Sequence, residues 1–212
     1  MIWDDVIGEP ERLAYEKAGW GGSVGFGSRP ALLVVDMYRA FVDPAYPFSA
    51  PDAVAVAERI GELLSRFRAR SLPVIFSTGI LGGTPAERGR WKVRATTESG
   101  VMQDPAAYEI WPSLERGGDE PLIEKRYPSA FFGTTLASVL TYHAVDTLVV
   151  TGTVTSGCVR ATCLDGFNLN YRVIVPEECV CDRGEVSHKV ALFEIQMKYG
   201  DVVPMASVLE RV

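Results

Sequence analysis

The chain has 212 residues, of which 47% are hydrophobic and 23% are charged, as expected for a globular domain with a substantial core. A formal net charge of −6 without a basic stripe argues against nucleic acid as a main partner. No apolar run reaches the roughly 18 residues that a membrane span needs, which argues against a membrane protein.

The N-terminal residues 1–29 are predicted to form an irregular arm with one short helix around residues 10–18. The segment Met1–Asp5 lacks the basic start and apolar core of a signal peptide, so a cytoplasmic location is expected. The glycine-rich run 21–27 follows no strand and is therefore a weak candidate for a phosphate loop. We expect the arm to pack on its own domain or to dock on a neighbouring subunit through apolar residues, namely Trp3, Tyr15 and Trp20.

The remaining residues, 30–212, are predicted to form one domain in which strands alternate with helices. That order indicates parallel βαβ units with right-handed crossovers, and so an α/β fold. The expected strands are 31–36, 73–78, 122–125, 147–151, 172–175 and 201–203, and the expected helices are 52–71, 134–143, 158–169 and 187–199.

Three chemically reactive side chains follow different predicted strands: Asp36, Lys125 and Cys158. Ligands of open parallel sheets bind beyond the carboxyl ends of the strands, so the fold can bring all three to one edge. There Asp36 could accept the proton of a cysteine nucleophile and return it to a leaving nitrogen. Lys125 could stabilise the thiolate and keep Asp36 ionised.

Each of these residues has a structural alternative. Cys158 alone could be a buried core thiol, Asp36 a helix N-cap, and Lys125 a solvated surface lysine. Their joint occurrence at three strand ends strengthens the catalytic interpretation, and the structural alternatives stay open on spacing alone.

Cys158 lies where a β-branched strand gives way to glycines, hydroxyl residues and then a helix. A thiol in the first turn of a helix feels the positive end of the helix dipole, which favours the thiolate. The free N–H groups of that turn could also stabilise an oxyanion.

The cysteine pattern gives little support to a metal site or to a disulfide framework. The chain has four cysteines and two histidines, and no two cysteines form a C-x-x-C pair. We expect no metal and no cofactor, and a cytosolic protein is not expected to carry disulfides. The cysteines are Cys158, Cys163, Cys179 and Cys181.

Several motifs, in order, cover most of residues 20–203. They are the runs 25–36 (GFGSRPALLVVD), 124–134 (EKRYPSAFFGT), 151–162 (TGTVTSGCVRAT), 181–184 (CDRG), 192–195 (LFEI) and 198–202 (KYGDV). On these motifs the chain resembles the isochorismatase-like cysteine hydrolases, within them the N-carbamoylsarcosine amidase and maleamate amidase branch.

The resemblance implies a three-layer α/β sandwich with a six-stranded parallel sheet. It implies Cys158 as nucleophile, Asp36 as general base and Lys125 as the partner of Asp36. It also implies a cis peptide at Val154–Thr155 and an oxyanion hole formed by the backbone N–H groups of Thr155 and Cys158. A homotetramer is implied as well.

The substrate end of the site is assigned by the same resemblance. Arg183 occupies the place of an arginine that grips a substrate carboxylate, and a guanidinium fork suits that role. Thr155, Trp91 and Trp111 are expected to contact the substrate as well. The segment 79–118, which contains Trp91, Arg94, Tyr108 and Trp111, matches the family least and is expected to shape the pocket.

Residues in which this sequence differs from related enzymes reduce the number of activities that we expect. Metal-dependent nicotinamidases of this superfamily carry an aspartate and histidines after the strand that corresponds to 73–78, and this chain has neither in 78–84. His143 and His188 lie near predicted helix ends and are expected to be caps or surface groups. The isochorismate ether hydrolases lack the cysteine.

We therefore expect a metal-independent cysteine amidohydrolase that cleaves a linear amide or ureido C–N bond of a small carboxylate-bearing compound and releases ammonia. Other small amides remain open as substrates, among them ureidoacrylate, biuret and nicotinamide-like compounds. A non-hydrolytic thiol sensor and a catalytically silent interaction protein on the same fold are further alternatives.

Overall fold

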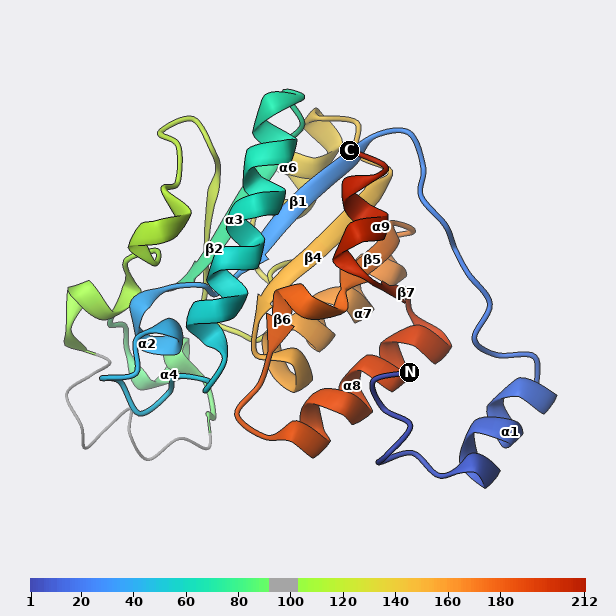
Figure 1. Ribbon diagram of the computed structural model, residues 1–212. Coiled ribbons are helices and arrows are strands. Elements are labelled where there is room, and N and C mark those ends of the chain that lie inside the picture. The colour runs from blue at the N-terminus through green and yellow to red at the C-terminus, as the bar shows by residue number, and fades with distance from the viewer. Residues whose placement is uncertain (92–102) are drawn as a thin grey trace.

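Strands and helices alternate along the computed structural model, which describes residues 1–91 and 103–212 (Figure 1). The elements are α1 (Glu9–Lys17), β1 (Pro30–Val35), α2 (Arg39–Val42), α3 (Ala53–Ala69), β2 (Val74–Gly79), α4 (Pro85–Arg88), the 3-10 turns η2 (Pro105–Tyr108) and η3 (Pro112–Leu114), β3 (Leu122–Lys125), α6 (Leu136–Tyr142), β4 (Thr147–Thr153), the π turn η4 (Thr155–Val159), α7 (Arg160–Asn168), β5 (Arg172–Pro176), the 3-10 turn η5 (Glu177–Cys179), β6 (Val180–Cys181), α8 (Glu185–Lys198), β7 (Asp201–Val203) and α9 (Met205–Leu209).

The sheet is parallel throughout its described pairings, with the order β3-β2-β1-β4-β5-β7. This order confirms the predicted α/β fold with a parallel sheet. The strand β6 also pairs with β4, beyond the end of β5. The sequence did not predict β6, because two residues are too few to show an apolar pattern.

The sheet is covered on both faces, which produces three layers. Its central strands β1 and β4 are buried along their whole length because helices pack on each side. Alternate residues of β1 point to opposite faces: Leu33 and Val35 join the cluster that contains α6, α7 and α8, while Leu32 and Val34 join the cluster that contains α3 and α9. Figure 1 shows α3 crossing one face of the sheet.

Two elements near the predicted nucleophile differ from their expected bounds. Strand β4 continues to Thr153 rather than ending at Thr151, because Gly152 and Thr153 gain β6 as a pairing partner. The helix expected at 158–169 is preceded by η4, a π turn, and its α-helical part begins at Arg160. Such turns are common at functional sites.

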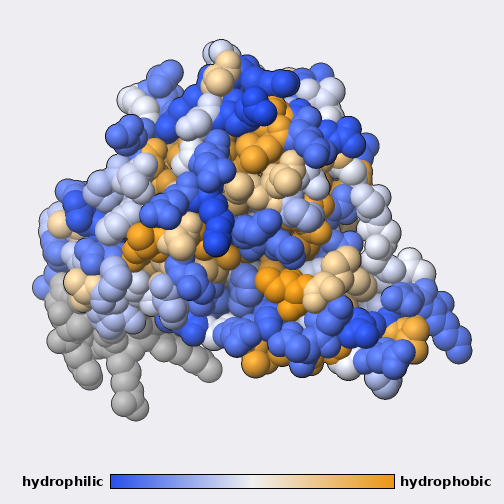
Figure 2. Space-filling view, in the orientation of Figure 1, coloured by the Kyte–Doolittle hydropathy of each residue, from blue (hydrophilic) through white to orange (hydrophobic). Residues whose placement is uncertain are grey.

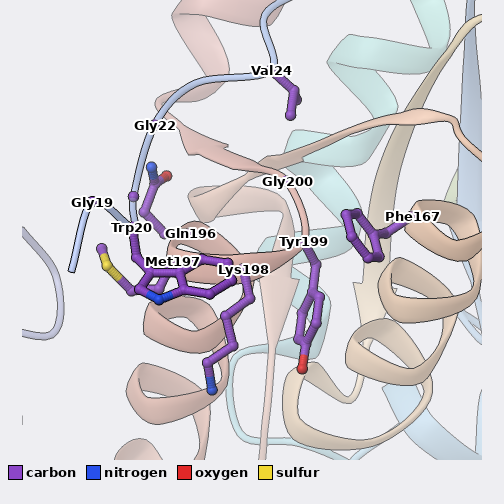
Figure 3. Close-up of a pocket in the computed structure, with 11 residues that line it drawn as sticks. Gly19, Trp20, Gly22, Val24, Phe167, Gln196, Met197, Lys198, Tyr199 and Gly200 are labelled. Carbon is purple, nitrogen blue, oxygen red and sulfur yellow. The ribbon is translucent and has the colours of Figure 1, made fainter. Parts of the chain in front are cut away.

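The N-terminal arm packs on its own chain. Trp3 is only 2% exposed, and the rings of Trp3 and Tyr15 both pack edge-on against Phe193 of α8. These two residues thus pack on their own domain, one of the two alternatives that the sequence left open, and docking of the arm on a neighbouring subunit stays a prediction. Trp20 is 56% exposed and borders a hollow of about 180 Å³ beside Phe167 and Tyr199, which Figure 3 shows in close-up.

Hydrophilic residues predominate on the face of the molecule shown in Figure 2, with apolar side chains in smaller areas between them. Across the described ranges, no helix combines the length and the apolar character needed to cross a membrane.

Candidate active site

The three predicted reactive residues meet at the carboxyl edge of the sheet. Asp36 directly follows β1, Lys125 is the last residue of β3, and Cys158 lies in η4 after β4. The strand register aligns Val35 with Gly152 and Gly79 with Lys125, so these strands end at the same level. The topology therefore gathers side chains that are far apart in the sequence.

Asp36 is almost fully buried and has a left-handed backbone conformation, with φ of 52°. Its two carboxylate oxygens have different partners. Ser77 Oγ donates to Oδ1 at 2.8 Å, and Lys125 Nζ lies 2.6 Å from Oδ2. The Asp36 N–H in turn donates to Ser77 Oγ, and the hydroxyl of Thr153 donates to the Asp36 carbonyl. The backbone of Asp36 is thus bound on one side to β2 through Ser77 and on the other to β4 through Thr153.

Lys125 connects the acid to the thiol. Its Nζ lies 2.6 Å from Asp36 Oδ2, 3.1 Å from the Tyr127 carbonyl and 3.4 Å from Cys158 Sγ. These acceptors match the three protons of an ammonium group. Burial alone would lower the pKa of Lys125, but the charge of Asp36 and the hydrogen bonds to Asp36 and Cys158 outweigh it and raise that pKa above its ordinary value. Lys125 is therefore cationic at neutral pH.

Cys158 lies in the π turn, whose defining bond runs from the Val159 N–H to the Val154 carbonyl at 3.3 Å. Burial raises the pKa of the Cys158 thiol to about 12; the charge of Asp36 adds to this, and Lys125 opposes it. The thiolate-favouring effect expected of a helix N-terminus is thus outweighed, and the resting side chain is a thiol beside a charged acid–base pair.

The cis peptide lies one residue earlier than expected. It joins Thr153 to Val154, and the prediction of Val154–Thr155 is wrong. The reason is the greater length of β4, which places the bond directly after the last strand residue, Thr153. Thr155, a predicted source of an oxyanion N–H, is buried and opens the same turn that carries Cys158.

Arg183 follows β6, in a loop attached to the cysteine turn. The N–H and hydroxyl of Ser156 both donate to Asp182 Oδ2 at 2.7 Å, and the Arg183 N–H donates to Asp182 Oδ1. The exposed Arg183 guanidinium donates to the Phe48 carbonyl at 2.8 Å and lies over the ring of Phe41. Part of its fork is therefore committed to the α2 region.

The two tryptophans proposed to contact the substrate lie in different surroundings. Trp91 is 47% exposed, and its indole N–H donates to the carbonyl of Arg126, next to Lys125. Trp111 instead packs against the core cluster beneath α3, whereas Cys158 packs against the cluster on the other face. Trp111 therefore contacts the hydrophobic core, and this position does not support the prediction that it contacts the substrate. Arg94 falls outside the described residues.

A family model described as the isochorismatase domain matches residues 30–207, which is most of the chain. The chain belongs to the isochorismatase family.

Relatives within the isochorismatase family span nearly the whole chain. It is 36% identical over 194 residues to the maleamate amidohydrolase of Pseudomonas putida, covering 91% of each protein. It is 32% identical over 201 residues to an N-carbamoylsarcosine amidase of Arthrobacter sp, covering 92% of this chain and 76% of that protein.

Solved structures of the family are also similar to this chain over most of its length. An N-carbamoylsarcosine amidase from Thermoplasma acidophilum superposes with a TM-score of 0.69 and 26% identity, covering 84% of this chain and 96% of that one. An isochorismatase family protein from Burkholderia thailandensis gives a TM-score of 0.79 and 26% identity, with coverage of 90% and 98%. The chain is thus an isochorismatase-like hydrolase.

The described residues hold no cluster of three or more histidine, cysteine, aspartate or glutamate side chains suited to a metal ion. The end of β2 contributes Thr78 and Gly79, and not the acid and histidines expected there for a metal-dependent nicotinamidase. Thr78 Oγ1 donates to the carbonyl of Tyr108.

Sequence reasoning missed the residues that support the three reactive side chains. Ser77 holds Asp36, yet within β2 it looks like an ordinary strand residue. His188 was expected to be a cap or surface group, but it is half-buried and its Nδ1 lies 2.8 Å from Thr155 Oγ1. The two hydroxyl residues that follow the apolar start of β2, Ser77 and Thr78, were the available signal for Ser77, whereas His188 had none.

Proposed function

We propose that this protein is a cysteine amidohydrolase that cleaves a linear amide or ureido C–N bond of a small carboxylate-bearing substrate and releases ammonia. The observation that carries the proposal is the contact of Lys125 Nζ with both Asp36 and Cys158. That contact joins a thiol, a carboxylate and an ammonium group, which supports their roles as nucleophile, base and charge-stabilising cation in a mechanism that requires no metal. The activities named for the curated relatives support the amide as the bond that is broken.

In the first half-reaction, Cys158 Sγ attacks the carbonyl carbon while Asp36 takes the thiol proton. The resulting oxyanion is stabilised by the backbone N–H groups of Val154, the residue that follows the cis bond, and of Cys158, while Lys125 balances the charge that moves between acid and sulfur. Asp36 then returns the proton to the nitrogen. The C–N bond breaks, ammonia leaves, and a thioester to Cys158 remains.

In the second half-reaction, water replaces ammonia. Asp36 removes a proton from the water as its oxygen attacks the thioester carbon, and the same N–H groups stabilise the second oxyanion. The C–S bond breaks, the proton passes from Asp36 to the sulfur, and the acid product leaves. Because the thiol is protonated at rest, proton transfer and attack are coupled in both directions.

The carboxylate preference rests on Arg183 and on the names of the two relatives. The Arg183 loop is tied to the cysteine turn through Asp182, so a guanidinium is available near the nucleophile. Substrates similar to N-carbamoylsarcosine or maleamate would place a carboxylate there.

The test is an ammonia-release screen with maleamate, N-carbamoyl amino acids, ureidoacrylate, biuret and nicotinamide. We expect turnover of the linear carboxylate-bearing amides, and a loss of about a thousandfold or more in kcat for Cys158→Ala. Cys179→Ala, in the core cluster on the opposite face of the sheet, is the matched control and should keep its turnover. Wild-type turnover in Cys158→Ala, or no ammonia from any compound, would reject the proposal.

A further inference from the structure

Tyr38 brings a phenol to the edge of the sheet where the three reactive side chains meet. It lies two residues after Asp36 and is only 6% exposed. A Cβ added at Gly79, the last residue of β2, would lie 3.4 Å from the Tyr38 hydroxyl oxygen. Gly79 pairs in register with Lys125, and register partners project to the same face of a sheet. The Tyr38 hydroxyl therefore lies on the face to which Lys125 points.

The Tyr38 hydroxyl has no hydrogen-bond partner within the described ranges, although a buried phenol usually finds one. An unpaired hydroxyl that is shut off from water costs free energy. In the described part of the chain, every buried side-chain nitrogen or oxygen that is fully shielded from water does have a partner. The hydroxyl is therefore the part of the Tyr38 side chain that stays open.

The charges of the reactive residues reach this hydroxyl. Burial raises the pKa of Tyr38 well above its ordinary value, and the charges of Asp36 and Cys158, followed by that of Tyr108, raise it further. Tyr38 is therefore a neutral phenol at pH 7, which can donate its proton to an oxygen. The carboxylate of Asp36 does not receive that proton, because its two oxygens bind Ser77 and Lys125.

The ring of Tyr38 is held from several sides. It stacks on Tyr108, with 5.9 Å between the ring centroids, and it packs edge-on against Phe41 at 4.9 Å. Its backbone forms a bridge with that of Ile110, and its carbonyl accepts the N–H of Phe41. The hydroxyl is thus fixed in place before a ligand arrives, which lowers the entropic cost of binding.

We propose that Tyr38 is a substrate-binding residue, whose hydroxyl donates a hydrogen bond to an oxygen atom of the bound amide. The inference rests on the proposed amide hydrolysis. Two oxygen acceptors of the substrate can take this bond. One is the reacting carbonyl. The other is the carboxylate, because the guanidinium of Arg183 lies over the same Phe41 ring against which Tyr38 packs.

The experiment removes the hydroxyl and keeps the ring, in Tyr38→Phe. With a carboxylate-bearing amide we expect kcat/KM to fall by about 10- to 100-fold, the range for losing a hydrogen bond to a charged oxygen. A neutral isostere of that amide separates the two acceptors. A loss confined to KM of the carboxylate substrate assigns the bond to the carboxylate. A loss of kcat with both substrates assigns it to the carbonyl, whose bond strengthens in the transition state.

Thermal unfolding separates substrate binding from a structural role. Since the hydroxyl has no partner in the described protein, Tyr38→Phe should have a Tm equal to or above that of the wild type. Tyr46→Phe is the matched control, because Tyr46 packs in the same aromatic cluster but its hydroxyl binds Asp104 at 3.1 Å. Its kcat/KM should stay within about twofold of wild type.

Unchanged kinetics of Tyr38→Phe with both substrates would overturn the inference. So would a clear fall in its Tm, which would show that the hydroxyl serves the fold, or an equal loss of activity in Tyr46→Phe. A wild type that releases ammonia from none of the amides would be a different failure, that of the proposed function itself.

Discussion

At the scale of single residues, the site works by giving each polar atom a separate partner. Asp36 receives Ser77 on one oxygen and Lys125 on the other, and Lys125 distributes its protons among a carboxylate, a carbonyl and a thiol. In this arrangement Lys125 is confined by three contacts. Arg183 differs, because it is exposed and only one of its described hydrogen bonds involves the guanidinium.

Arg183→Ala should raise KM for carboxylate-bearing amides by about 10- to 100-fold, the range expected for losing a charge-assisted pair, and leave uncharged amides unaffected. Steady-state kinetics with a carboxylate amide and its neutral isostere would measure the difference. Arg59→Ala is the matched control, since Arg59 is also exposed and donates to a backbone carbonyl, that of Glu178. An equal effect on charged and neutral substrates would contradict the proposed role.

The residues with reactive groups were predictable, whereas their supporting partners were not. Asp36, Lys125 and Cys158 each follow a strand, and strand order in an α/β fold is enough to bring them to one edge. The partners Ser77 and His188 act across 41 and 33 residues, through contacts that exist only after folding. Local sequence around His188 indicates a helix start and contains nothing about Thr155.

At the scale of elements, the close approach of β1 and β4 sets the geometry of the site. Gly152 has φ of 107° and pairs with Val35, the residue before Asp36. A Cβ added at Gly152 would overlap the Val35 carbonyl oxygen, which belongs to the backbone and cannot move aside. Only glycine fits where the two strand ends meet.

Gly152→Ala should therefore lower the free energy of unfolding by about 3 kcal/mol or more, from both overlap and backbone strain. At about 2–4 °C per kcal/mol for a chain of this size, the fall in Tm is readily measured by thermal unfolding. Gly61→Ala is the control: it lies within α3 with open space around its Cα and should be neutral or slightly stabilising. Equal Tm values for the two variants would refute the argument.

The apolar periodicity of the sequence was enough to predict which segments are strands and which are helices, but not where each one ends. The β4 residues beyond Thr151, Gly152 and Thr153, are small or hydroxylated and have no strand-like pattern. Gly152 pairs with β1, and both residues pair with β6, which is too short to predict. A π turn also has no sequence signature, because it shares its composition with an ordinary helix start.

At the scale of the whole molecule, two carboxylates attach the arm to the sheet. Asp201 in β7 accepts from Ser23, Val24 and Gly25, and Asp146 before β4 accepts from Ser28 and Arg29. The arm thus lies along the sheet edge between α1 and β1, as Figure 1 shows. Its own-chain packing could not be predicted, since an apolar arm fits a neighbour equally well by sequence.

Because of Asp146, the free energy of unfolding should fall as the solution becomes acidic. Burial would raise its pKa, but hydrogen bonds from Ser28, Thr147 and Arg29 prevail and lower it to about 2 from 3.8. A lowered pKa in the folded state stabilises the protein above pH 3.8, and this contribution is lost as the pH falls toward 2.

The predicted signature is a gap in the free energy of unfolding between wild type and Asp146→Asn. Denaturant unfolding should show the gap fully developed above about pH 4, narrowing as the pH falls from about 4 to 2. Asp119→Asn, a carboxylate of the loop before β3, serves as the control. A gap that stays constant with pH would show that Asp146 acts through its shape and not its charge.

The protonated state of Cys158 affects how the substrate-free protein reacts with oxidants and alkylating agents. Oxidants and alkylating agents attack thiolates far faster than thiols, so a nucleophile with a pKa of about 12 is poorly reactive toward them. In the proposed mechanism its reactivity arises when a bound carbonyl allows Asp36 to accept the proton as the new bond forms. On that mechanism we expect peroxide to modify the resting protein slowly, because the thiol becomes reactive only once a substrate is bound.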